Sequence, residues 1–477
     1  MGLLPIILPL AMAIIVFFTP SRRWRPRLLA ATALAHFALT VTALASPAPA
    51  SFGEWLRLDA PGRLLLGIIS LLFLCCAIYS VGYLRYRVER ANRRFCACLL
   101  VVLGTMSLVA FSQHLGLLWV GMEATTLATA PLIYFNRTPR SIEATWKYLV
   151  ISSVGIAMAL FGSFFLAYAA LHGGGAASLL FPDLLAGAAN LSRPWLRAGF
   201  TLLLVGYGTK MGLAPMHTWK PDAYGEAPGV VGAVLAGGVT SCAFLALARL
   251  TQITAAAGEG EYANRLLVMI GIASMGVAGA LLLGQRDLKR MLAYSSVEQM
   301  GILALATGLG AGATFATLLH LVNNALGKGA LFLTVGNLHR AFGGKTTGEV
   351  RGALRRLPIS GTIFLLSFFA VTGSPPFGLF VSEMLILKSI FAAERWLVGA
   401  LFLAGLFVVF AGMGATSLAA LQGRPPASAR ASAYRDGLAT AAPAMLLLGL
   451  VLLFGLHLPD GVQNLIADAA AALEVGR

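Results

Sequence analysis

Several ionisable side chains stand inside long apolar runs of this sequence, where a charge is costly to bury. The four clearest are Glu123 in LLWVGMEATTLA, Lys210 in LLLVGYGTKMGLAPMH, Lys328 in HLVNNALGKGALFL and Glu383 in PPFGLFVSEMLIL. A charge at the centre of a membrane helix costs about 2.5–3.5 kcal/mol, so residues of this kind usually have a function. We expect Glu298, His320 and Lys388 to be buried or half-buried as well.

Acids and bases that alternate inside a membrane are suited to proton transfer. A buried lysine gives up its proton more readily because burial penalises the charged form, and a nearby carboxylate opposes that effect. Moving or neutralising the carboxylate can therefore make the lysine take up or release a proton. The alternative is that the charges form static ion pairs that hold helices together, although small residues, Ser and Thr would do so at lower cost.

Proline breaks lie beside two of these residues. Pro215 interrupts the run that holds Lys210, and Pro375 with Pro376 interrupts the run that holds Glu383. Proline frees a backbone carbonyl, which at membrane depth must be satisfied by protein or by a water-filled cavity. The interrupted runs are the seventh and the twelfth along the chain, so they cross in opposite directions. This is the arrangement of an inverted repeat.

The elements that carry these residues are predicted to be membrane helices. Of the 477 residues, 58% are apolar and only 11% are charged, whereas soluble proteins hold about 25% charged residues. Mean hydropathy is +0.82. The runs are too long and too evenly apolar for barrel strands. Runs of about 17 residues or more, enough for one crossing, predict an all-α polytopic fold.

Fourteen such runs occur, and we expect them to form one membrane domain. They lie at 2–18, 28–45, 64–84, 95–113, 114–135, 146–171, 196–216, 228–250, 265–283, 292–310, 313–337, 358–391, 396–421 and 439–458. The most irregular loops are expected near 172–195 and 251–264.

The basic residues indicate how the chain is oriented. Loops after odd-numbered segments hold 24 Lys and Arg residues, among them Lys220, Lys289 and Arg430, whereas loops after even-numbered segments hold seven, among them Arg249. Because cytoplasmic loops are enriched in Lys and Arg, we predict that both termini lie outside the cytoplasm. The formal net charge of +16 is therefore attributed to membrane orientation rather than to nucleic-acid binding.

No sequence motif indicates a bound cofactor or metal. The five cysteines lie in apolar runs without CxxC or Cys/His ligand spacing, and no phosphate-binding loop, HExxH motif or nucleophile elbow occurs. We therefore expect no cofactor and no metal in this chain. The remaining histidines are expected at segment ends or in loops, as interfacial or hydrogen-bonded groups: His36, His114, His172, His339 and His457.

Four ordered motifs resemble a known family. They are GTKMGLAPMHTWKPDAYGEAP, RDLKRMLAYSSVEQMG, HLVNNALGKGALF and TGSPPFGLFVSEMLIL. Together they resemble the antiporter-like membrane subunits of respiratory complex I, multisubunit sodium/proton antiporters and membrane-bound hydrogenases, over residues 64–421. Two further stretches, WVGMEATTLATAPLIYF and EATWKYLVISSVGIAMALFG, are most similar to component F of hydrogenase-4 and formate hydrogenlyase complexes. The M-type subunit of complex I is the next most similar.

The resemblance implies a fold and a function. It implies helices 1–3 at 1–94, two inverted five-helix repeats at 95–250 and 265–421, and a fourteenth helix with a tail at 439–477. Each repeat would form a half-channel around a broken helix, the seventh or the twelfth. The chain would be an ion-translocating, in the first place proton-translocating, subunit of a hydrogenase-like or complex I-like oxidoreductase. It would lie in the inner (plasma) membrane beside other membrane and soluble subunits, without a redox cofactor of its own.

The resemblance also assigns roles to individual residues. Glu123 and Lys210 correspond to a charge-coupling pair, Lys328 to the central axis and Glu383 to the terminal proton exchange. The candidate relay residues are Glu298, His320 and His217, the last at the border of the first half-channel.

The chain departs from the family pattern at the central axis. Where many relatives have a lysine in the eighth helix, this chain has Thr240, Ser241 and Cys242. Histidines common in relatives are replaced by groups that hydrogen-bond without titrating near neutral pH, namely Gln299, Asn324 and Tyr224. We therefore expect protons to move there through ordered water. The chain is also expected to lack the long lateral helix of the L-type subunits, because it ends soon after the fourteenth helix.

Three alternatives stay open at this point. The chain could be a structural spacer that no longer conducts, which the replaced histidines favour and the four retained charges oppose. It could be a stand-alone cation/proton antiporter, for H⁺ or Na⁺. It could also be a secondary transporter of a small molecule, which would need a roomy central pocket rather than a chain of charges.

Overall fold

The computed structural model of the chain describes residues 2–45, 54–175, 177–427, 429 and 432–474. Within these ranges, helices and short 3₁₀ or π turns account for the regular structure, together with three isolated β-bridges. The all-α class predicted from the sequence is therefore confirmed for this part of the chain. Arg430 and the last three positions of the predicted tail, 475–477, lie outside the described residues.

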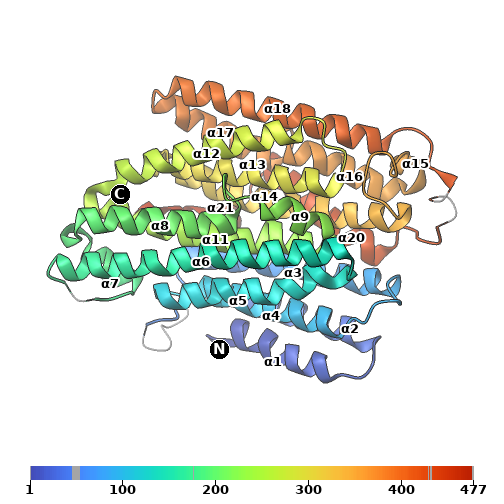
Figure 1. Cartoon of the computed structure of the whole chain (residues 1–477), viewed down its shortest axis with the longest axis horizontal. Helices are drawn as coiled ribbons and strands as arrows, with labels where there is room; N and C mark the ends of the chain where they lie inside the picture. Colours follow the sequence, from blue (N-terminus) through green and yellow to red (C-terminus); the bar gives the residue numbers. More distant parts are fainter. Residues whose placement is uncertain (1, 46–53, 176, 428, 430–431, 475–477) are drawn as a thin grey trace.

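Figure 1 shows long helices lying side by side in one bundle, with α1 and α18 at opposite edges. The first half contains α1 (Leu4–Phe18), α2 (Trp24–Ala45), α3 (Ala60–Arg85), α4 (Arg93–Phe111), α5 (Leu115–Ile133), α6 (Pro139–His172), α8 (Arg193–Met211), α9 (Trp219–Glu226), α10 (Gly229–Ala233) and α11 (Thr240–Thr254). The second half contains α12 (Gly260–Leu282), α13 (Leu288–Thr307), α14 (Thr314–Phe342), α16 (Pro358–Val371), α17 (Gly378–Ala392), α18 (Trp396–Leu421) and α20 (Leu438–Leu456). Two short helices, α7 (Phe181–Ala186) and α15 (Ala353–Arg356), lie in connections, and α21 (Asp460–Glu474) follows α20.

Every apolar segment predicted from the sequence coincides with one of these helices or with a broken pair. Nine helices in the described ranges are long and apolar enough to cross a membrane. Large apolar side chains also face outward, for example Ile14, Phe161 and Phe407, which are 62%, 57% and 72% exposed. Such a surface suits lipid rather than water. The chain is a multi-pass membrane protein, while the number of crossings remains a prediction.

One of the nine apolar helices, Gly229–Leu282, is divided by a turn at 255–259. Gly258 takes the left-handed conformation there, with φ of +79°, which glycine adopts at little cost. Glu259 in the same turn pairs with Arg197 at 2.7 Å. The irregular loop expected at 251–264 is therefore mostly helical, because a single glycine is enough to separate α11 from α12.

The predicted break at Pro215 lies between α8 and α9. Helix α8 ends where Gly212 takes a left-handed conformation with φ of +76°, and α9 begins at Trp219. Protein groups satisfy the freed backbone: Trp219 Nε1 donates to Thr209 O at 2.9 Å, and Ser274 Oγ of α12 accepts a backbone N–H of the break at 2.9 Å. Other helices therefore hold this interruption in place.

The second break, at Pro375 and Pro376, separates α16 from α17. Gly373 in this break has φ of +64°. A Cβ atom added to Gly373 would lie 1.8 Å from Glu383 Oε2. Glycine is needed here both for the backbone conformation and for the close approach of the Glu383 carboxylate.

A π-helical turn, η3 (Val234–Val239), joins α10 to α11. Gly237 of this turn lies on the backbone of α14, because a Cβ atom there would be 2.8 Å from Ala325 O. Turns of this kind are frequent at functional sites. In this chain, η3 lets the eighth predicted segment approach the helix that carries Lys328.

Three basic residues that the sequence analysis assigns to loops are inside the protein. Lys220, Lys289 and Arg249 are 0%, 1% and 2% exposed. Lys289 Nζ donates to Ala227 O at 2.9 Å, and Arg249 pairs with Asp59 at 2.7 Å. The loop assignment is wrong for these residues because tertiary contacts bring them into the bundle. The excess of basic residues after odd-numbered segments persists without them.

His36 lies in the middle of α2 rather than at a segment end, so its predicted location is wrong. Its ring nitrogens contact Ser70 Oγ of α3 at 2.8 Å and Ser107 Oγ of α4 at 3.0 Å. It is therefore hydrogen-bonded, as expected. The other four histidines expected at segment ends or in loops do lie at helix ends: His114 caps α5, His172 and His339 are in the last turns of α6 and α14, and His457 follows α20.

Candidate functional site

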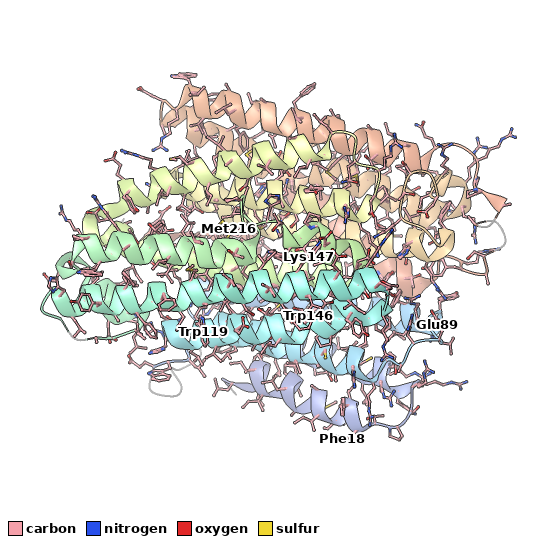
Figure 2. The ribbon with its side chains drawn as sticks, viewed as in Figure 1. Phe18, Glu89, Trp119, Trp146, Lys147 and Met216 are labelled. Carbon is pink, nitrogen blue, oxygen red and sulfur yellow. The ribbon has the colours of Figure 1, made fainter. Side chains whose placement is uncertain are left out.

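The candidate site is a line of buried polar groups that follows both broken helices. Figure 2 places Met216, in the break between α8 and α9, near the middle of the molecule, while Phe18 and Glu89 lie toward its periphery. The polar groups come from α5, α6, α8, α9, α13, α14 and α17, and they fall into two clusters.

The first cluster surrounds Lys210, near the end of α8. Lys210 is 0% exposed, and its Nζ donates to Thr126 Oγ1 at 2.7 Å and to Tyr148 OH at 2.9 Å. Tyr148 OH in turn lies 2.7 Å from Thr129 Oγ1. Hydroxyl groups of α5 and α6 thus hold the Lys210 amine inside the bundle.

Glu123 belongs to the same cluster but does not bind Lys210 directly. Its Oε1 accepts from Ser153 Oγ at 3.0 Å, and its Oε2 is buried without a hydrogen-bond partner among the described residues. No salt bridge joins Glu123 to Lys210 in the described ranges, although the two interact electrostatically. Glu123 lies one helical turn before Thr126, so about 5–6 Å separates their Cβ atoms. The members of the predicted pair therefore interact electrostatically, without a direct hydrogen bond among the described residues.

The second cluster surrounds Lys328 of α14. Lys328 is 0% exposed, and its Nζ donates to Ser295 Oγ of α13 at 2.5 Å. Glu298 lies one helical turn after Ser295 and interacts electrostatically with Lys328. Gln299 Nε2 donates to Glu298 Oε2 at 2.9 Å and to Val371 O at 3.2 Å. Gln299 thereby connects Glu298 to the end of α16, where the second break begins.

Glu383 lies at the second break and is 2% exposed. Its Oε1 has no hydrogen-bond partner among the described residues, and the carboxylate interacts electrostatically with Glu298. The preceding residue, Ser382, has its Oγ 3.0 Å from His320 Nδ1. The structure therefore places Glu383, Glu298 and His320 in one neighbourhood, on three different helices.

Lys388 does not belong to this line. It is exposed on α17 and borders a side cavity of about 430 Å³ together with Leu309 and Leu385. The expectation that it is buried or half-buried is wrong, because Lys388 points away from the face of α17 that carries Glu383.

Unpaired polar atoms accompany both clusters. Buried polar groups in proteins are normally hydrogen-bonded to protein or to ordered water. The buried side-chain atoms here that lack a partner among the described residues include Glu123 Oε2, Tyr207 OH, His217 Nδ1, Tyr224 OH, Gln299 Oε1, His320 Nε2, Asn324 Oδ1, Asn324 Nδ2 and Glu383 Oε1. Their concentration along the two breaks favours ordered water molecules between the clusters.

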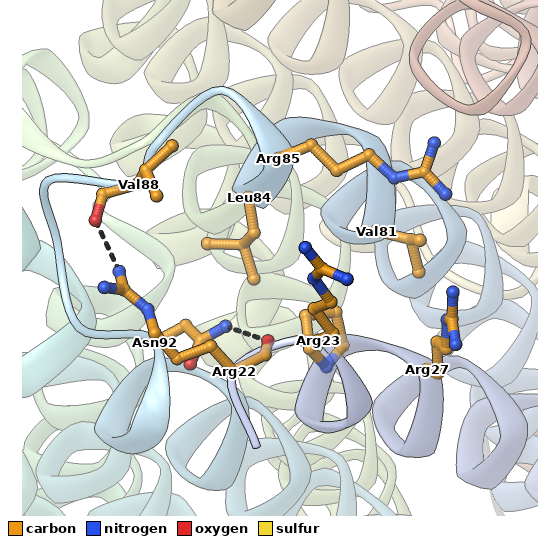
Figure 3. A pocket seen from close by; sticks show the side chains of 9 residues that line it. Arg22, Arg23, Arg27, Val81, Leu84, Arg85, Val88 and Asn92 are labelled. Atoms are coloured by element: carbon orange, nitrogen blue, oxygen red, sulfur yellow. Dashed lines mark hydrogen bonds between the residues drawn. The ribbon is translucent and has the colours of Figure 1, made fainter.

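Two cavities of the chain lie away from the two clusters. One, of about 520 Å³, is lined by Arg22, Arg23, Arg27 and Arg85 between α2 and α3. Figure 3 shows these arginines around the pocket, with Arg22 bound to the Val88 carbonyl. Neither this cavity nor the side cavity at Lys388 reaches the two clusters.

The described residues contain no group of three or more His, Cys, Asp or Glu side chains that could hold a metal ion. Sequence reasoning also missed several members of the site, namely Thr126, Tyr148, Ser153, Lys220, Ser295 and Ser296. All of them lie inside the motifs that carry the family resemblance or next to a buried charge. Hydroxyl groups are common in helices, however, so their role becomes visible only in the tertiary structure.

Residues 112–408, which contain both clusters, match the transmembrane family of NADH:quinone oxidoreductase and Mrp antiporter proteins. The chain belongs to this family. A hydrogenase-4 component F homolog from Methylacidiphilum infernorum is 36% identical over 334 residues, which cover 68% of this chain and 70% of the relative. The resemblance inferred from the motifs is thereby confirmed.

Two further comparisons agree with this assignment. NADH-quinone oxidoreductase subunit N from Desulforudis audaxviator is 30% identical over 388 residues, covering 80% of this chain and 76% of the relative. The sequence motifs predict that, after component F, the M-type subunit of complex I is the next most similar protein. The relative from Desulforudis audaxviator is instead an N-type subunit. A chain of the Mrp complex from Dietzia sp. DQ12-45-1b superimposes with a TM-score of 0.86 at 21% identity, over 99% of this chain and 97% of that chain. At this sequence identity, the superposition shows a shared fold only.

Proposed function

We propose that this chain translocates protons across the inner membrane as a subunit of a hydrogenase-like or complex I-like complex. The observation that carries the proposal is the line of buried acids and bases along two broken helices, accompanied by unpaired polar atoms. A static framework would satisfy those polar atoms within the protein, because a buried polar atom without a hydrogen bond costs free energy. A hydrated path needs them to remain available to water.

In this proposal, Glu123 controls the proton on Lys210. The electrostatic attraction between the two favours the protonated lysine, so moving or protonating Glu123 favours proton release. Thr126 and Tyr148 hold the amine in place in both states. Because the pair interacts, its proton equilibria belong to the pair rather than to either residue.

The second cluster would take the proton onward. Lys328 would receive the proton beside Ser295. Glu298 would control the proton on Lys328, as Glu123 controls the proton on Lys210. Glu383 would exchange the proton with one side of the membrane, and His320 would order water beside it. The path would run laterally, at similar depth through several helices.

The proposal includes two inverted repeats, 95–250 and 265–421, each with one half-channel. The contacts between helices support it, since α6 packs against α8 as α14 packs against α16 and α17, and α5 packs against α6 as α13 packs against α14. Glu123 on α5 and Glu298 on α13 occupy corresponding helices in this scheme.

The energy source would be electron transfer in other subunits. The relatives are named as components of hydrogenase-4 and of NADH-quinone oxidoreductase, and we propose partners of these kinds here. Both termini would lie on the extracytoplasmic side, because basic residues are concentrated after odd-numbered segments. A reporter that is active only in the cytoplasm should stay silent at the C-terminus.

The test uses Glu123→Gln in the intact complex in membrane vesicles. We expect most redox-driven proton movement to be lost while the complex remains assembled, because glutamine cannot carry the controlling charge. Glu261→Gln is a matched control, since Glu261 is a surface residue that pairs with Arg265 at 2.9 Å. Normal proton movement in Glu123→Gln would favour the spacer alternative. Movement that requires Na⁺ would identify a sodium-coupled antiporter instead.

A further inference from the structure

Lys220 is a buried base that neither the motif assignments nor the proposed mechanism uses. It lies on α9, directly after the first break, and is 0% exposed. Its Nζ donates to Ser296 Oγ at 3.0 Å and lies 3.4 Å from Ser296 O. No salt bridge in the described ranges pairs it with a carboxylate. A buried amine held only by neutral groups is expensive to keep charged.

The side chain of Lys220 fills the gap in the broken helix. A Cβ atom added to Gly212 would lie 2.3 Å from Lys220 Cε and 3.0 Å from Lys220 Nζ. The end of the Lys220 side chain therefore lies against Gly212, the first residue of the break after α8 and two positions after Lys210. The C-terminus of a helix carries partial negative charge, which favours a cation when one is present.

Lys220 also lies next to the second cluster. Ser295 and Ser296 are adjacent on α13, and they bind Lys328 and Lys220 respectively. The two lysines interact electrostatically. Because both amines are buried and each is positive only when protonated, a proton on one opposes a proton on the other.

Aromatic residues connect Lys220 to the first cluster. Lys220 Nζ lies 5.9 Å from the centre of the Tyr224 ring, and Trp219 lies between Tyr224 and Tyr148, at ring distances of 5.9 Å and 5.0 Å. Tyr148 is the residue whose hydroxyl holds Lys210. The hydroxyl of Tyr224 is buried without a partner among the described residues, so it is available to water beside Lys220.

The eighth predicted segment does not supply a base in this region. Thr240 and Ser241 donate to carbonyls of their own helix, Ala236 O at 2.6 Å and Gly237 O at 2.7 Å. These hydroxyls are occupied by their own helix, and Cys242 is not a base of comparable strength. Lys220 is therefore the buried amine that lies between Lys210 and Lys328.

We propose that Lys220 is a proton-carrying residue that links the Lys210 cluster to the Lys328 cluster, an inference that rests on the proposed function. A proton leaves the Lys210 ammonium, passes through hydrogen-bonded water and binds the neutral Lys220 amine. It then leaves Lys220 for the neutral Lys328 amine. Each step breaks one N–H bond and forms another, without a change of redox state. The titratable groups that face this route are Lys328, Glu298, His217 and Tyr224.

The test compares Lys220→Arg and Lys220→Gln in the intact complex, in vesicles energised by its native electron donor. Arginine keeps the positive charge but does not release its proton, and glutamine keeps a hydrogen-bond donor but cannot carry a proton. We expect both variants to lower the number of protons moved per electron by about 100-fold. Lys220→His should retain part of the transport, because imidazole can accept and release a proton.

The same experiment separates this inference from a structural role. If Lys220 only supplies a charge, Lys220→Arg should transport normally, and if it only supplies a hydrogen bond, Lys220→Gln should. Either result would overturn the inference. Lys289→Gln is the matched control, since Lys289 is buried and donates to a backbone carbonyl away from the clusters, and it should transport normally.

Failure of the inference can be distinguished from failure of the proposed function. Normal transport in the Lys220 variants together with lost transport in Lys210→Met overturns only the role of Lys220. Normal transport in Lys210→Met overturns both. If the Lys220 variants do not assemble, Ser296→Ala decides: we expect transport to fall several-fold because the acceptor of Lys220 is lost, and unchanged transport counts against the inference.

Discussion

The two broken helices hold their charged residues in different ways. At the first break, the Lys210 amine is bound by two hydroxyls, and its acid, Glu123, is half-buried. At the second break, the acids Glu298 and Glu383 are 1% and 2% exposed. Glu123 is therefore partly exposed as a residue, although its unpaired Oε2 is itself buried, whereas Glu383 is enclosed.

In the proposed mechanism, this difference would assign separate tasks to the two halves. The first half would receive an electrostatic signal, because Glu123 is half-buried and its Oε2 has no hydrogen-bond partner among the described residues. In the same proposal, the second half would deliver the proton, because Glu383 lies near the acid Glu298 and the amide Gln299, and no salt bridge in the described ranges pairs it with a base. The proposed line of clusters would therefore be directional rather than symmetric.

The largest effect is expected from Glu383→Gln. This change removes the proton-binding group at the second break, so transport should fall by about 100-fold in vesicles, as expected for the loss of an acid–base group. The redox activity of the partner subunits and the assembly of the complex are measured in parallel. Lys388→Gln, on the exposed side of the same helix, is the control and should behave as the wild type. Normal transport in Glu383→Gln would remove the second break from the route.

A smaller effect is expected at Asn324, whose side-chain oxygen and nitrogen are both buried without a partner among the described residues. Asn324→Leu should remove ordered water from this part of α14, because a water chain needs polar groups at hydrogen-bond distance. Proton transport should therefore fall by about tenfold. Asn324→His should preserve or raise transport. Normal transport in Asn324→Leu would show that the lateral route does not pass this residue.

The smallest effect is expected from Tyr148→Phe in the first half. It removes one of the two hydroxyls that bind Lys210, which is worth about 1 kcal/mol and thus about a fivefold change in rate. The ring and its contact with Trp219 remain. Transport is compared with Tyr168→Phe, since Tyr168 lies on the same helix and is exposed. Equal transport in the two variants would contradict the role of the hydroxyl.

Much of the fold could be predicted from the sequence, for a physical reason. A membrane helix must bury its backbone in lipid, so its apolar run is long and continuous, and each predicted segment coincides with a helix. The breaks were also predictable, because Pro215, Pro375 and Pro376 leave backbone groups that only a polar interior can satisfy.

The partners within the site could not be predicted in the same way. Lys220 lies in the polar stretch PMHTWKPDAYGEAP, which has the composition of a loop but folds into the bundle. Lys388 lies in an apolar run, yet the direction of its side chain depends on how α17 is rotated after the break. Neither fact is contained in local hydrophobicity, because both depend on contacts between distant helices.

The central claim is that protons cross through the buried lysines of both clusters. The most direct measurement is the ratio of protons moved to electrons transferred in vesicles that contain the intact complex, with Lys210→Met and Lys328→Met compared with the wild type. The account predicts that each variant assembles and that each lowers this ratio by about 100-fold. A wild-type ratio in both assembled variants would contradict it.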